Sequence, residues 1–367
     1  MMFFKSALYM EFAKDLDVSQ ADCVLAFSGI TCPFSLAELG IDERVLKNVS
    51  YYPYGKPELK AAIASRYGTQ PDQVLVPSGG TSLSNFLVAA ALLNPGDRVL
   101  IETPTYEPLA ATIASTGAQL IPLPRPTDLE YGIDLQKLER LMQPPVKLVA
   151  VTRLHNPSGK DIPADILIQI GEKAAEIDAY VLVDEVYLDF MPPGSFKIAA
   201  ALHPRLITTS SITKVYGMGD LRIGWAIGPT ELVRQCWRIN NVLGVNPPTI
   251  PDQIAVELFR NGSLDRIGQW SRRRAAENLA ILEKTWRNHS ALEWVKPDGG
   301  IVAFIRLKDG RDSSPLVTRL KEKYRTLVMP GRYFNQPDGF RLGFGVSPEE
   351  LQEGLRRIGL ALEELPG

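Results

Sequence analysis

Short apolar runs alternate with helix-like segments along the middle of the chain. The runs LVAV (148–151) and YVLV (180–183) are apolar at every position, as is typical of strands covered by helices on both faces of a sheet. Segments of helical period lie between such runs, for example at 57–67 and 164–176. This alternation predicts an α/β fold with a mostly parallel central sheet and helices on both faces.

The pattern changes near residue 262. A long charged helical stretch, SLDRIGQWSRRRAAENLAILEKTW, is followed by the strand-like GGIVAFIRL and FRLGFG and by the helical VSPEELQEGLRRIGLALEEL. The opening MMFFKSALYMEFAKDLDV also predicts a helix. We therefore expect a large domain over residues 37–262 and a smaller α+β domain formed by residues 1–36 together with 263–367.

Composition and charge narrow the class of protein. Of the 367 residues, 45% are hydrophobic and 22% are charged, which is an ordinary globular composition. The net charge of −2, without a long block of like charge, disfavours binding to nucleic acid or to a membrane surface. The first apolar run is short and is soon broken by Lys5, so it predicts neither a signal peptide nor a membrane span.

Cysteine and histidine are sparse. The three cysteines are widely spaced and form no CxxC pair, and the three histidines are scattered. This distribution predicts neither a disulfide framework nor a metal site, and it favours a reducing, cytoplasmic location.

Polar clusters follow three of the predicted strands. LVAVTR leads into LHNPSG (154–159), YVLV leads into DEVY (184–187), and LITT leads into SSITK (210–214). Each cluster alone is compatible with an ordinary turn. Because ligands bind at the carboxyl ends of strands in open α/β sheets, the three clusters together predict one shared crevice.

A fourth cluster, SGGTS (78–82), lies between a predicted strand and a helix predicted over 82–93. Small residues at this place let backbone N–H groups close around an anion, and the helix N-terminus adds partial positive charge. The cluster therefore predicts a phosphate site, although N-capping of the helix by Thr81 or Ser82 would explain the same residues.

Six short motifs follow one another along the chain. SGGTS is followed by TPTYEP, HNPSG, VDEVY, SSITKVYGMGDLRIGW and a late FRLGFG. This order resembles the class I/II family of fold-type I aminotransferases, which depend on pyridoxal 5′-phosphate. The resemblance covers nearly the whole chain. It implies a two-lobed fold, amino acid and 2-oxo acid substrates, and a homodimer with active sites at the subunit interface.

The resemblance assigns roles around the cofactor ring. Lys214 would form an imine with the cofactor aldehyde and then carry a proton to and from the substrate. Asp184 would pair with the pyridine nitrogen, and Tyr187 and Asn156 would bond the 3-oxygen. Tyr106 would stack on the ring, although it could equally be a packing aromatic.

The resemblance also assigns the phosphate site. Gly80 and Thr81 would offer backbone amides and a hydroxyl, Ser211 a second hydroxyl and Arg222 a bidentate guanidinium. In this family a tyrosine from the other subunit often completes the site. The segment VSYYPYGKPEL offers both Tyr51 and Tyr52, and the sequence leaves the choice open.

The substrate carboxylate would be bound by Arg341 in DGFRLGFG, with Asn156 and the backbone of Gly29 beside it. Around Gly29, AFSGITCP departs from the family's usual acidic residue and proline after the glycine. That departure weakens the assignment of Gly29, and it is compatible with a distinctive substrate entrance.

The type of reaction stays open at this point. Transamination is the first interpretation, but the same lysine, aspartate and arginine support decarboxylation, β-elimination, and cyclisation of an arginine derivative. SGITCPFSLAEL, HNPSG and LVMPGRYF loosely resemble the capreomycidine synthases, which carry out that cyclisation. A non-catalytic protein that binds the cofactor is a further alternative, disfavoured because Lys214, Asp184 and Arg341 are all present.

Overall fold

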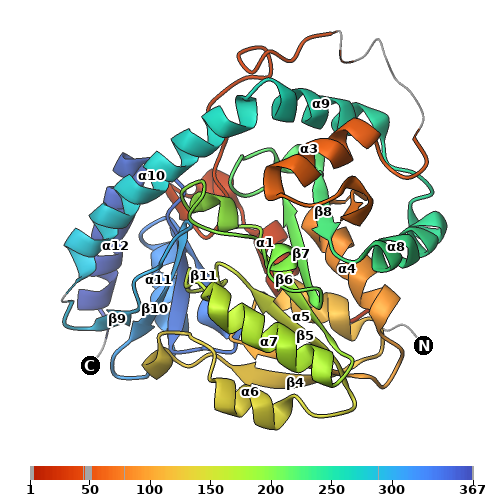
Figure 1. The fold of residues 1–367 in the computed structure, drawn as a ribbon. Coiled ribbons are helices and arrows are strands. Elements are labelled where there is room, and N and C mark those ends of the chain that lie inside the picture. Colours follow the sequence, from red (N-terminus) through yellow and green to blue (C-terminus); the bar gives the residue numbers. More distant parts are fainter. Residues whose placement is uncertain (1–3, 44, 46–51, 78, 288, 366–367) are drawn as a thin grey trace.

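The computed structural model describes residues 4–43, 45, 52–77, 79–287 and 289–365. A seven-stranded sheet forms its centre, in the order β2-β8-β7-β6-β5-β3-β4 (Figure 1). Strands β3 to β7 run parallel to one another, and β8 runs antiparallel to both β7 and β2. The strands are β2 (Val74–Leu75), β3 (Arg98–Thr103), β4 (Gln119–Pro124), β5 (Val146–Thr152), β6 (Tyr180–Asp184), β7 (Leu206–Ser211) and β8 (Gly224–Ile227).

Helices cover both faces of this sheet. In β5, Leu148 and Ala150 pack into the core on one face, while Val149 and Val151 pack into the core on the other. Strands buried on both sides in this way must be apolar at successive positions, as the sequence pattern predicted. The first face is covered by α4 (Gly80–Leu92), α5 (Glu107–Ala114) and α8 (Thr230–Leu243), and the second by α6 (Leu135–Leu141) and α7 (Ala164–Glu176).

A second sheet of five strands, in the order β1-β11-β12-β10-β9, joins the two ends of the chain. Its first strand comes from the N-terminal region and pairs in parallel with β11. The strands are β1 (Cys23–Leu25), β9 (Leu292–Trp294), β10 (Val302–Leu307), β11 (Thr326–Pro330) and β12 (Gly339–Gly343), and α11 (Ser314–Glu322) and α12 (Pro348–Glu363) lie with them.

Long helices connect the two sheets. Figure 1 shows α10 (Ser263–Trp286) running from α9 (Thr249–Arg260) toward α12 and the second sheet, with α3 (Pro57–Tyr67) beside α9. Helix α1 (Leu8–Asp15) packs against both α5 and the core of the second sheet. The mostly parallel α/β class predicted from the sequence is confirmed, whereas the division at residues 36/37 and 262/263 stays a prediction.

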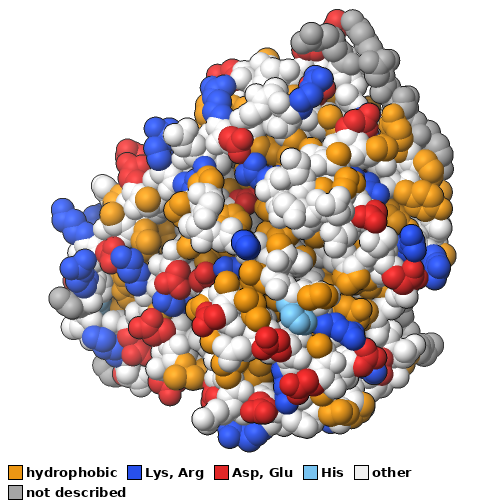
Figure 2. All heavy atoms as spheres, viewed as in Figure 1, with side chains coloured by type: hydrophobic (Ala, Val, Ile, Leu, Met, Phe, Trp, Pro, Cys, Tyr) orange, Lys and Arg blue, Asp and Glu red, His pale blue; other side chains and the backbone are white. Residues whose placement is uncertain are grey.

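None of the helices in the described ranges is long and apolar enough to cross a membrane. Among these residues there is also no group of three or more histidine, cysteine or acidic side chains placed to hold a metal ion. In Figure 2, acidic and basic side chains are interspersed over the visible face.

Candidate active site

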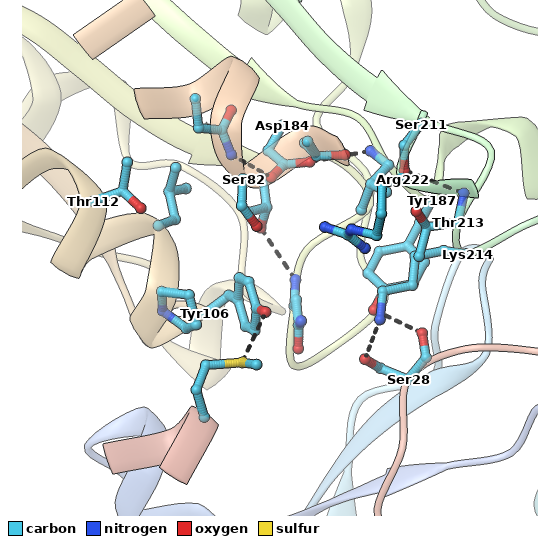
Figure 3. A pocket seen from close by; sticks show the side chains of 18 residues that line it. Ser28, Ser82, Tyr106, Thr112, Asp184, Tyr187, Ser211, Thr213, Lys214 and Arg222 are labelled. Atoms are coloured by element: carbon cyan, nitrogen blue, oxygen red, sulfur yellow. Dashed lines mark hydrogen bonds between the residues drawn. The ribbon is translucent and has the colours of Figure 1, made fainter. Parts of the chain in front are cut away.

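A cavity of about 220 Å³ lies at the carboxyl ends of β5, β6 and β7 (Figure 3). The three polar clusters that follow these strands meet there, as the strand-end argument predicted. The predicted site residues that line the cavity are Thr81, Tyr106, Asn156, Asp184, Tyr187, Ser211, Lys214 and Arg222.

Lys214 follows β7 and points its amine into this cavity. Its Nζ donates to the hydroxyl of Ser28 at 3.3 Å (Figure 3). The pKa of the amine is lowered to about 8, chiefly by burial and also by the positive charges of Arg341 and Arg222, while the charge of Asp184 acts in the opposite direction. A lysine with such a pKa has a substantial neutral fraction near neutral pH, so it can act as a nucleophile or a base.

Asp184 ends β6 and is 5% exposed. One carboxylate oxygen accepts from Nδ2 of Asn85 at 3.0 Å and the other from the backbone N–H of Val186 at 3.2 Å. Burial raises the pKa of this carboxyl to about 6, and the two hydrogen bonds and the charge of Lys214 act against the rise. The carboxylate is therefore poised to gain from a cationic ligand.

Two tyrosines line opposite parts of the cavity. The Tyr187 hydroxyl donates to the backbone oxygen of Ser28 at 3.1 Å. Tyr106 packs edge-on against Tyr9, with ring centroids 5.2 Å apart, and its hydroxyl contacts Sδ of Met10 at 3.6 Å. Tyr106 thus lines the cavity and packs against α1 at the same time, and its stacking on the cofactor ring stays a prediction.

Arg222 and the start of α4 form the predicted phosphate site. Among the described residues, the buried hydroxyl of Thr81 has no hydrogen-bond partner, and the backbone amides that begin a helix have no partner within it. The Gly80 amide is an exception, because it donates to the Arg222 carbonyl at 2.8 Å. Contrary to the sequence-based assignment, that amide is not free in this structure to bind phosphate.

Close packing holds this part of the backbone in place. Arg222 Nη2 donates to the Gly79 carbonyl at 2.7 Å, and a Cβ added to Gly224 in β8 would lie 2.5 Å from the backbone nitrogen of Thr81. Only glycine lets β8 approach α4 so closely. The unpartnered Thr81 hydroxyl, the helix amides and the guanidinium suit a phosphate group.

Arg341 in β12 is fully buried, behind the cavity wall. Its guanidinium donates to Oδ1 of Asn156 at 3.1 Å and to the Ala26 carbonyl at 2.7 Å, whereas its Nε has no partner among the described residues. The rings of Tyr9 and Phe334 lie 5.5 and 5.4 Å from it. Because no described carboxylate pairs with it, this buried charge would gain from an anionic ligand.

Besides Gly80 and Arg341, two described residues of the predicted site, Gly29 and Tyr52, do not line this cavity. Gly29 lies next to Ser28, which does line it. Tyr52 lines a separate hollow, where its ring lies 4.9 Å from the Lys56 amine. Tyr51 lies outside the described residues.

The structure adds residues that motif reading missed. Ser28 and Asn85 both line the cavity, and the Thr209 hydroxyl donates to Oδ1 of Asn85 at 2.6 Å. The sequence held one indication of Asn85, because this residue lies four positions after Thr81 and therefore on the same side of the predicted helix. Ser28 left no comparable signal, since it reaches Lys214 across 186 positions of sequence.

A strand-end cavity that brings together a lysine, a carboxylate, a guanidinium and a helix N-terminus fits the fold-type I enzymes that depend on pyridoxal 5′-phosphate. The family described as aminotransferase class I and II matches residues 41–358. The chain belongs to this family, whose cofactor is pyridoxal 5′-phosphate. The described donor set fits that cofactor, with the hydroxyl of Thr81 and Arg222 toward a phosphate and Asp184 toward a ring nitrogen.

Individual relatives differ in their reactions. The chain is 30% identical over 306 residues to the capreomycidine synthase of Streptomyces vinaceus, covering 83% of this chain and 78% of that protein. It is 27% identical over 352 residues to the arginine–pyruvate transaminase AruH of Pseudomonas aeruginosa, covering 91% and 88%. The solved structure of the PLP-dependent cyclase OrfR matches with a TM-score of 0.88 at 26% identity, covering 98% and 97%.

Proposed function

We propose that this protein is an aminotransferase that moves an amino group between an amino acid and a 2-oxo acid. The observation that carries the cofactor chemistry of this proposal is the meeting of the Lys214 amine, the Asp184 carboxylate and the Arg222 guanidinium in one cavity, and the family description favours transamination as the reaction. Each serves a different part of the cofactor, and the three come from distant segments of the chain.

The cofactor, when bound, supplies an aldehyde that condenses with amines and a ring that accepts electrons from the substrate α-carbon. In our proposal Lys214 is the amine that holds this aldehyde and later carries a proton. Asp184 holds the ring nitrogen in its protonated state, and Asn156 and Tyr187 donate to the ring oxygen. Ser211, Thr81 and Arg222 hold the phosphate.

Arg341 is proposed to bind the substrate α-carboxylate. It is a buried guanidinium with an unpartnered Nε and no described carboxylate within ion-pair distance, and it already bonds Asn156. A carboxylate that enters the cavity beside Asn156 would satisfy the Nε and neutralise the charge.

Cyclisation of an arginine derivative is the second candidate, because capreomycidine synthase is 30% identical over most of its length. The described cavity lining favours neither reaction, since its only carboxylate is Asp184 and its only guanidinium is Arg222. Decarboxylation, β-elimination and non-catalytic cofactor binding gain no specific support from the described residues.

We also propose a homodimer. Four hydrophobic side chains at the end of α8 and the start of α9 are 84, 50, 64 and 45% exposed, and we call them the α8–α9 patch: Val242, Leu243, Val245 and Ile250. Hydrophobic side chains gather on the same edge in Figure 2. An exposed apolar cluster of this kind favours a protein partner, and the family resemblance suggests a second copy of the chain.

The proposed cytoplasmic location is supported by Cys23, Cys32 and Cys236, which are all free thiols.

A screen with single amino acids distinguishes the reactions. The holoenzyme is mixed with each amino acid in turn, its visible cofactor absorbance is followed, and the products are analysed by mass spectrometry. Formation of a 2-oxo acid, with the cofactor left in its amine form, supports transamination. A cyclised arginine derivative supports the second candidate, and no reaction with any amino acid contradicts both.

A pair of lysine variants controls the screen. Lys214→Ala is expected to abolish the reaction. Lys60→Ala removes a partly buried lysine of α3 that does not line the cavity, and this variant is expected to react as the wild type.

A further inference from the structure

Two buried side chains behind Asp184 form a hydrogen-bonded chain that the family comparison does not describe. The Thr209 hydroxyl donates to Oδ1 of Asn85 at 2.6 Å, and Nδ2 of Asn85 donates to Oδ2 of Asp184 at 3.0 Å. Thr209 is fully buried and Asn85 is 4% exposed, so water does not compete for these bonds.

The sheet explains why these residues meet. Asp184 and Thr209 are register partners on the parallel neighbours β6 and β7, so their side chains leave the same face of the sheet. Helix α4 packs on both strands and carries Asn85. The chain therefore joins the helix that begins the phosphate site to the strand that ends in Asp184.

The direction of the hydrogen bonds is determined by the chemistry of the groups. An ionised carboxylate only accepts hydrogen bonds, so the NH₂ of Asn85 must face it and the amide oxygen must face Thr209. The hydroxyl can then only donate to that oxygen. Protonation of Oδ2 of Asp184 would require the Asn85 amide to turn over and Thr209 to accept instead of donate, so the arrangement as it stands favours the ionised carboxylate.

The preference for an ionised Asp184 opposes the effect of burial on the pKa of this carboxyl group. Desolvation raises the pKa of Asp184, and among the causes that lower it the hydrogen bond from Asn85 is the largest, ahead of the Val186 amide and the charge of Lys214. A protonated Asp184 would have no negative charge to pair with a protonated ring nitrogen. Without Asn85 the pKa of Asp184 would rise further, and the carboxylate would lose one of the two hydrogen bonds that orient it.

We propose that Asn85 and Thr209 are positioning residues that hold Asp184 ionised and aimed at the ring nitrogen of the cofactor. Asn85 acts directly on the carboxylate, and Thr209 acts by fixing the orientation of the Asn85 amide. The proposal rests on cofactor binding at the proposed site and does not depend on which reaction follows.

The test measures the dissociation constant of pyridoxal 5′-phosphate by titrating apoprotein and following its visible absorbance. Asn85→Leu removes the donor at similar volume and is expected to weaken binding roughly 10- to 100-fold, as for a lost hydrogen bond to a charged group. Thr209→Val is expected to weaken it roughly 3- to 10-fold, and Thr209→Ser, which keeps the hydroxyl, is expected to restore wild-type affinity.

Thr208→Val is the matched control. Thr208 is the preceding residue of β7 and is equally buried, and its hydroxyl donates to Glu185 at 2.6 Å on the opposite face of the sheet. Its loss removes a similar hydrogen bond and should lower the free energy of unfolding, yet leave the dissociation constant unchanged.

The proposal is overturned if Thr209→Val and Asn85→Leu bind the cofactor within twofold of the wild type, or if Thr208→Val weakens binding as much as Thr209→Val. Should Asn85→Leu not fold, the comparison of Thr209→Val, Thr209→Ser and Thr208→Val decides alone. Wild-type protein that binds the cofactor but converts no amino acid contradicts the proposed function and leaves this inference standing. Wild-type protein that binds no cofactor overturns both.

Discussion

At the scale of single residues, Lys214 has a charge that the fold disfavours. Its pKa is lowered to about 8 chiefly by burial, so the unfolded chain binds a proton more readily than the folded apoprotein between about pH 8 and its ordinary value. Below about pH 8 the charged amine therefore lowers the free energy of unfolding of the apoprotein by its full amount. This destabilisation decreases as the pH rises from about 8 to the ordinary pKa of lysine.

Lys214→Met should therefore stabilise the apoprotein while it abolishes activity. We expect the free energy of unfolding to rise by roughly 1–3 kcal/mol at pH 7 and by much less at pH 10. Urea unfolding of both apoproteins at the two pH values measures the difference. An equal gain at both pH values would mean that the charge of Lys214 is not the cause.

Ser28 gives a second test at this scale. Its hydroxyl accepts from the Lys214 amine. In the proposed function that amine would be free whenever a substrate has displaced it from the cofactor. Ser28→Ala should lower kcat roughly 10-fold and change KM little. A change of about 10-fold lies at the lower end of the range for the loss of one hydrogen bond to a charged group. Ser313→Ala serves as control, because it also removes a buried serine hydroxyl. That hydroxyl bonds the Gly339 carbonyl in the second sheet, so this variant should keep the wild-type kcat.

Motif order in the sequence predicted Lys214, Asp184, Asn156 and Arg222 as neighbours, and the structure places all four at one cavity. The sequence could not predict that the Gly80 amide is already bonded to Arg222, because that depends on a backbone contact across 142 positions. Contacts such as this one exist only once the chain has folded.

At the scale of elements, α1 is attached by a carboxylate from another helix. Ala7 at its N-cap provides no side-chain hydrogen bond, and the Glu107 carboxylate from α5 accepts from the backbone amides of Leu8 and Tyr9 instead. An anion at a helix N-terminus is stabilising. This attachment brings Met10 to the cavity.

Glu107→Ala should loosen α1 without removing any residue of the cavity lining. Given roughly 0.3–2 kcal/mol for such a charge, amide hydrogen exchange over residues 8–15 should become roughly 2- to 30-fold faster. Mass spectrometry of exchanged peptides measures this rate. Glu107→Gln keeps one acceptor oxygen, so its exchange rate is expected to lie between those of the wild type and Glu107→Ala. Unchanged exchange in Glu107→Ala would show that α1 does not depend on the carboxylate.

Most elements of the large sheet were predictable, because each is long enough to show its own period. Helices α3 and α7 begin and end at the predicted residues. Strand β1 was not predictable, since its three residues carry no period of their own and its partner β11 lies 303 positions later. Its pairing is what joins the N-terminal region to the second sheet.

At the scale of the whole molecule, the α8–α9 patch predicts how copies of the chain associate. Val242 is 84% exposed, so Val242→Glu should leave the chain folded while it places a charge in the proposed interface. We expect light scattering to show a shift from dimer to monomer, with loss of activity. Leu129→Glu, at an exposed leucine elsewhere, should remain dimeric. A dimeric Val242→Glu protein would place the interface elsewhere.

The proposed attachment of the cofactor to Lys214 can be measured by chemical trapping. Borohydride fixes an aldehyde to the lysine with which it has condensed, and peptide mass spectrometry of the reduced holoprotein then identifies that lysine. We expect a cofactor-derived mass on the peptide that contains Lys214, and on no other peptide. A label on another lysine, or no label in protein saturated with the cofactor, would contradict it.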